Sequence, residues 1–197
     1  MDFNDIYEQF QPKIRRYLTR LAGQNEAEDI TQEVFEKVSR SLRHFKGESK
    51  VSTWLYRIAT HAAIDRMRSP SFQRISQHTS IEESPEIEDR NTWSDQIKTS
   101  TDQILIQKEM NECIREFIDQ LPSDYKAVVI LSELEGFKNR EIADILQVSL
   151  DTVKIRLHRA RTKLKEALDD GCDFYHNEHS VLACDRKSSQ ILPNMPK

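Results

Sequence analysis

NREIADILQVSLDTVKIRLHRARTKLKEAL, residues 139–168, contains two helical patterns separated by a tight turn at residues 148–149. The second helix is basic, because residues 149–168 contain six Lys or Arg against one Asp and one Glu. Two helices joined by a tight turn, with the second one basic, are the pattern of a helix-turn-helix. Since the net charge of the whole chain is −4, this local excess of cations indicates a polyanionic partner for this segment.

The basic helix separates its apolar and cationic side chains onto opposite faces. At about 100° per residue, the packing face is formed by Val153, Leu157, Ala160, Leu164 and Leu168. The opposite face carries Thr152, Ile155, Arg156, Arg159 and Lys163. We expect DNA as the partner, because neutralising phosphates releases counterions, and we expect side chains near the helix start to reach base edges. The alternative for this helix taken alone is a solvated amphipathic surface.

The bulk composition favours helices and a cytoplasmic location. The chain has 197 residues with only 4 Gly and is rich in Glu, Lys, Arg, Leu and Ile. Its first residues lack the basic and apolar segments of a signal peptide, and no stretch approaches the roughly 18 apolar residues of a membrane span. We therefore expect no membrane insertion, and we expect the three cysteines to be reduced thiols or metal ligands.

Apolar residues at helical spacing predict an all-α fold of two small helical domains joined by an acidic flexible linker. Residues 69–102 interrupt the periodicity with seven acidic residues, three basic residues and two prolines, a composition typical of linkers. The second domain ends in the helix-turn-helix. The predicted segments are a first domain at 1–69, the linker at 70–102, a second domain at 103–169 and a tail at 170–197.

Three motifs in this order resemble the extracytoplasmic-function group of sigma-70 RNA polymerase sigma factors. AEDITQEVFEKV (27–38) and STWLYRIATHAAIDRMRS (52–69) are similar to region 2 of that family. The segment LPSDYKAVVILSELEGFKNREIADILQVSLDTVKIRLHRARTKLKEAL (121–168) is similar to region 4. The resemblance covers roughly residues 3–168. It implies an alternative sigma factor that binds core RNA polymerase and directs promoter recognition, DNA opening and transcription initiation.

The resemblance assigns a role to the acidic helix of the first domain. In the family, this helix docks on the clamp helices of the largest catalytic subunit of the polymerase. The matching positions here are Asp29, Gln32 and Glu33. They fall outside the apolar stripe of their helix, which agrees with an exposed role, while an ordinary solvated acidic face is the alternative.

The resemblance also implies two promoter-binding surfaces. The −10 element would be contacted by Phe45, Lys46, Lys50, His61, Asp65 and Arg66, with a loop at residues 45–51 holding a flipped base. Trp54, at helical spacing with Leu55 and Ile58, is expected in the core. The −35 element would be contacted by Ser149, Thr152, Ile155, Arg156, Arg159 and Lys163. Many family members have a small polar residue where this chain has Ile155.

The tail, which lies beyond the family core, contains a separate candidate site. Its soft and borderline ligands are Cys172, His176, His179 and Cys184. Four such ligands can hold zinc tetrahedrally, although the spacing C-x3-H-x2-H-x4-C matches no common zinc finger. The alternative is a tail with chance Cys and His. Cys113 occupies an apolar position of its helix and is expected to be inert packing.

Two other functional classes fit the sequence less well than a sigma factor does. A response-regulator-type transcription factor also ends in a helix-turn-helix, but its receiver domain needs alternating strands and helices, and residues 1–68 predict only helices. An enzyme is disfavoured because the sequence contains no Gly-rich phosphate loop and no nucleophile elbow. No cofactor is required by the resemblance, and an anti-sigma factor is the further partner class that it allows.

Overall fold

The computed structural model describes residues 2–70, 72, 101–177 and 182–187, and for residues 101–109 it describes the helical backbone alone. Nearly all of the predicted acidic linker, residues 70–102, lies outside the described residues. His179 and the end of the tail, residues 188–197, also lie outside them.

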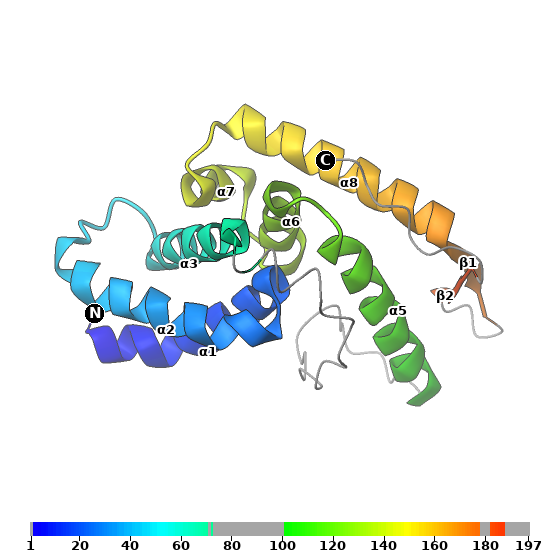
Figure 1. Ribbon diagram of the computed structural model, residues 1–197, viewed down its shortest axis with the longest axis horizontal. Coiled ribbons are helices and arrows are strands. Elements are labelled where there is room, and N and C mark those ends of the chain that lie inside the picture. Colours follow the sequence, from blue (N-terminus) through cyan, green and yellow to red (C-terminus); the bar gives the residue numbers. More distant parts are fainter. Residues whose placement is uncertain (1, 71, 73–100, 178–181, 188–197) are drawn as a thin grey trace.

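The first half of the chain forms three long helices that pack side by side (Figure 1). These are α1 (Phe3–Ala22), α2 (Gln24–Ser41) and α3 (Val51–Arg68), and a short 3-10 helix, η1 (Leu42–His44), follows α2. Each helix buries the apolar stripe that its sequence predicts, and the three stripes meet in one hydrophobic core.

The second half of the chain is also mainly helical and contains the longest described helix. Its elements are α5 (Thr101–Asp119), α6 (Ser123–Val129), a π-helical turn η2 (Ile130–Leu134), α7 (Asn139–Leu146) and α8 (Leu150–Gly171). In Figure 1, α8 runs along one side of the molecule, with α7 beside its start and α5 near its end. The predicted all-α class is confirmed, with one small sheet added at the end of the described chain.

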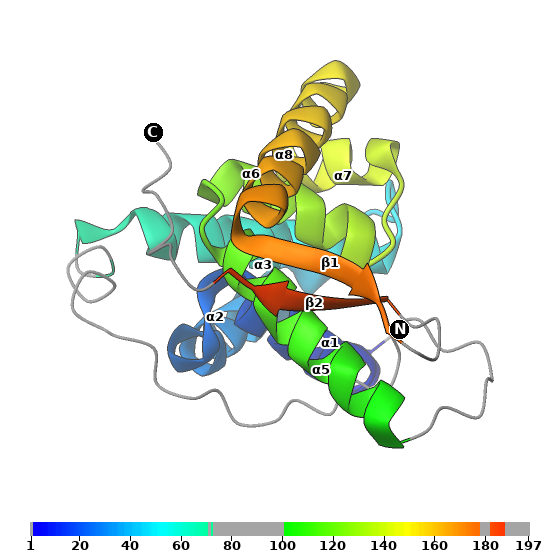
Figure 2. The ribbon, with the colours of Figure 1, turned by 90° about the vertical axis from the view of Figure 1, so that its right-hand side faces the viewer.

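That sheet is an antiparallel hairpin formed by the tail. Strand β1 (Cys172–His176) continues directly from α8 and pairs with β2 (Leu182–Arg186). In the register of the hairpin, Cys172 lies opposite Arg186, and Phe174 lies opposite Cys184. Figure 2 shows the hairpin lying across α5 at the end of α8, so the tail is anchored on the second helical group.

The two helical groups pack against each other. Helix α3 of the first group lies beside α7 of the second, and buried residues from both groups belong to the same hydrophobic cluster (Figure 1). The surfaces that the sequence assigns to the −10 and −35 elements are therefore close together in this arrangement. No helix among the described residues is long and apolar enough to cross a bilayer.

Candidate nucleic-acid interface

The predicted helix-turn-helix is formed by α7 and α8. Helix α7 ends at Leu146, and Gln147 takes a left-handed conformation with φ of 53°, which turns the chain sharply. Ser149 then caps α8, because its hydroxyl oxygen accepts a hydrogen bond from the backbone N–H of Thr152 at 3.1 Å. Ser149 was predicted to contact DNA, and in the structure its side chain is engaged in this cap.

The core side of α8 is centred on three buried residues, Val153, Leu157 and Ala160. They confirm the predicted packing face, whereas Leu164 is only partly buried. On a helical wheel with Leu157 at zero, Val153 and Ala160 both lie on one side, at about −40° and −60°. The face directed away from the protein is therefore rotated relative to the one that the sequence predicted.

This rotation changes which side chains are open to solvent. Ile155 is 51% exposed, and Arg159 is also exposed, as predicted for −35 contacts. Arg156 is half-buried, and its guanidinium Nη2 lies 2.9 Å from a carboxylate oxygen of Asp124 on α6. Thr152 and Lys163 are half-buried as well.

Lys154 and His158 are exposed on the outward face of α8, and the sequence reasoning did not assign them to DNA. Neither belongs to the face that the sequence predicts for DNA contacts. The signal that could have identified them is that Val153 and Ala160 both lie on one side of Leu157, because this places Lys154 and His158 on the opposite, solvent-facing flank.

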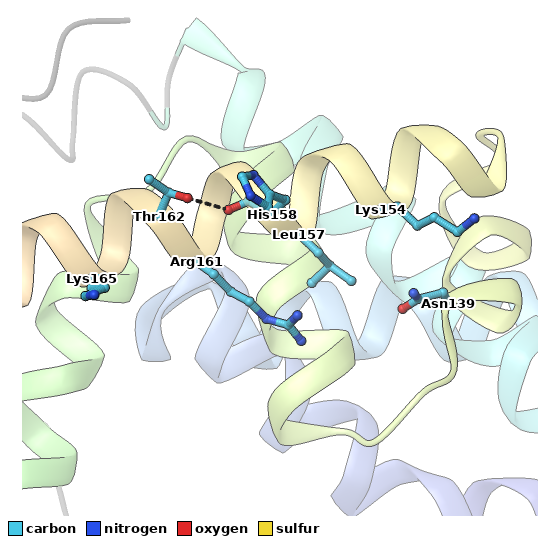
Figure 3. A pocket seen from close by; sticks show the side chains of 7 residues that line it. All are labelled: Asn139, Lys154, Leu157, His158, Arg161, Thr162 and Lys165. Carbon is cyan, nitrogen blue, oxygen red and sulfur yellow. Dashed lines mark hydrogen bonds between the residues drawn. The ribbon is translucent and has the colours of Figure 1, made fainter.

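A shallow groove on this flank of α8 gathers further cations (Figure 3). It is lined by Asn139, Lys154, Leu157, His158, Arg161, Thr162 and Lys165. Asn139 lies at the start of α7, so the groove is bounded by both helices of the helix-turn-helix. Its basic lining suits an anionic group such as a backbone phosphate, although Arg161 also contacts Glu133 with its Nη2 at 2.5 Å.

The predicted polymerase-binding residues lie on the outer surface of α2. Asp29 and Gln32 are exposed. Glu33 is half-buried, and one carboxylate oxygen lies 2.7 Å from Lys37 Nζ while the other lies 3.9 Å from Arg66. Asp29 and Gln32 are therefore the more available groups for a partner, and Glu33 is partly neutralised within the chain.

The predicted −10 surface is only partly open. Lys46, His61 and Asp65 are exposed. Phe45 is half-buried, and its ring lies 4.9 Å from that of Trp54, which is 7% exposed and therefore in the core, as predicted. The loop at residues 45–51, which was predicted to hold a flipped base, lies beside α7. Residues of this loop and residues at the end of α7 line the same cavity.

Two predicted −10 cations are engaged in ion pairs. Arg66 lies 3.2 Å from Glu26 on α2. Lys50 Nζ lies 2.8 Å from Glu141 on α7, so this cation joins the −10 loop to the helix-turn-helix. Hydrogen bonds from Lys50 and from the backbone N–H of Lys138 lower the pKa of Glu141, which remains a carboxylate at neutral pH.

A buried polar contact also joins the two helical groups. Arg20 Nη1 on α1 lies 2.9 Å from one carboxylate oxygen of Glu135, and these side chains are 9% and 4% exposed. Tyr56 on α3 donates its hydroxyl to the other oxygen at 2.6 Å. Burial and the Glu135 charge raise the pKa of Tyr56, so this hydroxyl remains a donor at physiological pH.

In the tail, the two cysteines are grouped, whereas the described histidine, His176, lies apart from them. Cys172 and Cys184 lie together, and Cys113 of α5 joins them, with all three sulfur atoms within 4.8 Å of one another. His176 is exposed and does not belong to this group. Of the predicted set, Cys172 and Cys184 lie together, His176 lies apart from them, and His179 lies outside the described residues. Cys113, which was expected to be inert packing, lies beside both thiols.

Burial is the main factor that raises the pKa of the Cys172 thiol, to about 12, and burial also raises the pKa of Cys184. Both side chains are therefore neutral thiols at physiological pH in the metal-free chain. A buried thiol of high pKa is a poor nucleophile, so these two cysteines are expected to react slowly in the metal-free chain.

Two family models match the chain. The model described as Sigma-70 region 2 covers residues 6–72, and the model described as Sigma-70, region 4 covers residues 111–164. The first match spans nearly all of α1 to α3, and the second includes the C-terminal half of α5 together with α6, α7 and much of α8.

Curated relatives match across both regions. The ECF RNA polymerase sigma-E factor of Haemophilus influenzae is 32% identical over 166 residues, which are 84% of this chain and 87% of that protein. The ECF RNA polymerase sigma factor SigW of Bacillus subtilis is 33% identical over 174 residues, which are 85% of this chain and 89% of that protein.

A solved structure supports the fold. The sigma factor RpoE of Bartonella quintana, crystallised with the anti-sigma factor NepR, superposes with a TM-score of 0.62 at 23% identity. The match covers 85% of this chain and 97% of that chain.

Proposed function

This chain belongs to the extracytoplasmic-function group of RNA polymerase sigma factors, and on that premise we propose which of its surfaces bind core polymerase and which bind promoter DNA. As an alternative sigma factor, it binds core RNA polymerase and directs promoter recognition and transcription initiation. The polymerase carries out RNA synthesis, so we assign the chain no catalysis of its own and a site of action in the cytoplasm.

The exposed basic face of α8 is the observation that carries the DNA-binding proposal. Lys154, Ile155, His158 and Arg159 point away from the core of the second helical group. A helix of this kind fits the major groove, where cations hold phosphates and the exposed apolar group of Ile155 contacts a thymine methyl. This face replaces the predicted set in part, since Arg156 and Ser149 have structural partners within the chain.

The basic groove beside this face extends the proposed contact. Lys165 and Arg161 lie further along α8, and Asn139 lies at the start of α7 (Figure 3). A phosphate on the edge of the major groove would meet both helices there, which fixes the register of the recognition helix without recognising sequence.

For core polymerase, we propose the outer surface of α2 around Asp29 and Gln32. Glu33 contributes less, because Lys37 and Arg66 already lie beside its carboxylate. A basic or polar surface of the polymerase would complement these groups.

For the −10 element, we propose Lys46, His61 and Asp65 with the loop around Phe45. This surface becomes complete only when the two helical groups separate, because Lys50 and the loop hollow are engaged by α7. The distance between promoter elements supports the same conclusion. Sites centred near −10 and −35 are roughly 25 base pairs apart, or about 85 Å along the duplex. Helix α8, with 22 residues, spans only about 33 Å.

An anti-sigma factor is a further partner that we propose for this chain. The matching solved structure is a complex of a sigma factor with an anti-sigma factor. In the closed arrangement, by which we mean the packing of α3 against α7, such a regulator would bind across the interface between the two helical groups and hold them together.

Holoenzyme assembly tests the polymerase surface. Asp29→Ala combined with Gln32→Ala should weaken co-elution with core RNA polymerase while leaving the helix content unchanged. Glu28→Ala is the matched control, because Glu28 is exposed on the same helix but faces Arg15 of α1 at 3.2 Å. Equal co-elution of the double variant and the control would remove this surface from the account.

A further inference from the structure

Three cysteines that are distant in the sequence meet at the end of the molecule opposite to the turn of the helix-turn-helix. Cys113 lies on α5, while Cys172 and Cys184 lie on the two strands of the hairpin. The Cys113 and Cys172 sulfur atoms are 3.6 Å apart, although 59 positions separate these residues in the chain. All three are free thiols.

The sulfur positions fit a common metal ion. With Zn–S bonds near 2.3 Å and tetrahedral angles, two sulfur ligands of one zinc ion lie about 3.8 Å apart. The observed pair is at 3.6 Å, and the third sulfur lies within 4.8 Å of both. Small side-chain rotations are therefore sufficient to bring three sulfur atoms onto one ion.

The hairpin presents its two thiols on one face. Cys184 lies opposite Phe174, which is two residues after Cys172, so both cysteines point to the same side of the sheet. That side faces α5, which supplies Cys113 (Figure 2). The hairpin is also held on α5 by an ion pair between Arg186 and Glu116, three residues after Cys113.

The local charge suits a thiolate cluster. Three thiolates on one divalent ion carry a net charge of −1, and the guanidinium of Arg186 lies close enough to Cys172 to favour negative charge there. This cation reduces the cost of placing an anionic metal centre at this half-buried position.

We propose that Cys113, Cys172 and Cys184 form a three-thiolate site for a thiophilic metal ion of the zinc class. The three sulfur atoms occupy three positions of a tetrahedron, and the fourth position is open to water or to an added ligand. The bound ion joins α5 to the hairpin and so fixes the C-terminal end of α8. It lies far from Ser149 and Ile155, so it stabilises the recognition helix without covering its DNA-binding face.

Zinc titration of the full chain, purified anaerobically and freed of metal, tests this site. Competition with a chromophoric chelator should give one zinc per chain. Cobalt substitution should give the intense thiolate-to-cobalt charge-transfer absorption of a sulfur-rich tetrahedral site. Alkylation followed by mass spectrometry should show that zinc protects all three cysteines together, a readout that needs no variant and so does not depend on a variant folding.

Variants separate this site from a metal site within the tail alone. Cys113→Ser should weaken zinc binding at least about 100-fold, because loss of a ligand exceeds the 10- to 100-fold cost of altering groups around a ligand. Cys172→Ser should have a comparable effect. His176→Ala is the matched control and should leave the zinc affinity unchanged, since His176 lies outside the group.

Three outcomes would overturn the proposal. The first is the absence of stoichiometric zinc binding. The second is zinc affinity that depends on His176 but not on Cys113, because the ligands would then belong to the tail alone. The third is a Cys172–Cys184 disulfide in the anaerobically purified chain, which would remove two of the three ligands.

Discussion

Ile155 is an apolar residue that α8 exposes at 51%, on the face that we assign to the major groove. Exposed aliphatic groups contribute little to stability, so a polar replacement should leave the free energy of unfolding within about 0.5 kcal/mol. At a promoter, the same group can contact a thymine methyl.

Ile155→Ser is therefore expected to change the preference at a single −35 position by about 1 kcal/mol. Transcription from a set of promoters with each base at each −35 position measures this preference. An unchanged preference would mean that Ile155 does not contact the bases.

Lys154 and Arg156 differ by two positions, and the structure gives them different roles. Lys154 is exposed beside Asp151, whereas Arg156 is half-buried against Asp124. Lys154→Ala should weaken binding of holoenzyme to all promoters alike and reduce the slope of log affinity against log salt by about 0.9. Arg156→Ala should leave that slope unchanged and lower the free energy of unfolding. Equal slopes of log affinity against log salt for the two variants would contradict the assignment of Lys154, in place of Arg156, to the DNA-binding face of α8.

At the scale of single residues, the sequence predicts which side chains are buried better than it predicts which charged side chains form ion pairs with one another. Trp54 and Leu157 are buried as their spacing predicts. The partner of Arg156 could not be predicted, because Asp124 belongs to another helix and only the packing of α6 on α8 brings the two charges together.

At the scale of elements, helix interiors follow the apolar pattern and helix ends depend on local geometry. A proline inside a helix ordinarily ends or kinks it, but α1 continues through Pro12 from Phe3 to Ala22. One backbone hydrogen bond is lost at a proline, and the buried apolar residues on both sides of Pro12 outweigh that loss.

The start of α8 is the element boundary on which the recognition helix depends. Ser149 accepts the hydrogen bond from the Thr152 N–H, so Ser149→Ala should cost about 1 kcal/mol of stability. Ser149→Gly is the matched control and should cost only a few tenths of a kcal/mol, because glycine leaves the helix end open to water. Urea unfolding of both variants measures the difference, and equal stabilities would argue that the cap is not formed in solution.

At the scale of the whole molecule, the closed arrangement of the two helical groups determines which DNA-binding residues are available. The buried Arg20–Glu135 pair and the Tyr56 hydroxyl form its polar centre. Lys50 and Glu141 form a further contact at its edge. Because α7 covers part of the proposed −10 surface in this arrangement, we expect the free chain to bind promoter DNA weakly without core polymerase.

Tyr56→Phe removes one hydrogen bond to the Glu135 carboxylate and keeps the aromatic packing. Hydrogen bonds to charged groups contribute about 1.5–3 kcal/mol, so the equilibrium constant between the closed and open arrangements should fall at least about tenfold. X-ray scattering should show a larger radius of gyration, and binding of promoter DNA by the free chain should tighten.

Tyr17→Phe is the control for this experiment. It removes the buried Tyr17–Thr60 hydrogen bond of 2.7 Å, which lies within the first helical group. This variant should lower the free energy of unfolding without opening the molecule. Equal radii of gyration for the Tyr56 and Tyr17 variants would contradict the assignment of Glu135 as the closing contact.

Long-range contacts mark the limit of prediction from the sequence. Arg20 and Glu135 are 115 positions apart, and neither belongs to a motif that indicates a partner. The proximity of Cys113 to the two tail cysteines could not be predicted either. An apolar helix position shows the same sequence pattern whether the residue packs against the core or against another thiol. The family core and its helices could be predicted because their signal is local and periodic.

The most direct test of the account is transcription in vitro by core RNA polymerase that contains no other sigma factor, over a library of promoter sequences. The account predicts that adding this chain produces transcripts from a defined set of −10 and −35 sequences, and that Lys154→Ala with Arg159→Ala abolishes them. A response-regulator-type factor would instead require a second sigma factor. Absence of transcripts with core alone, and their appearance only when another sigma factor is supplied, would contradict the central claim.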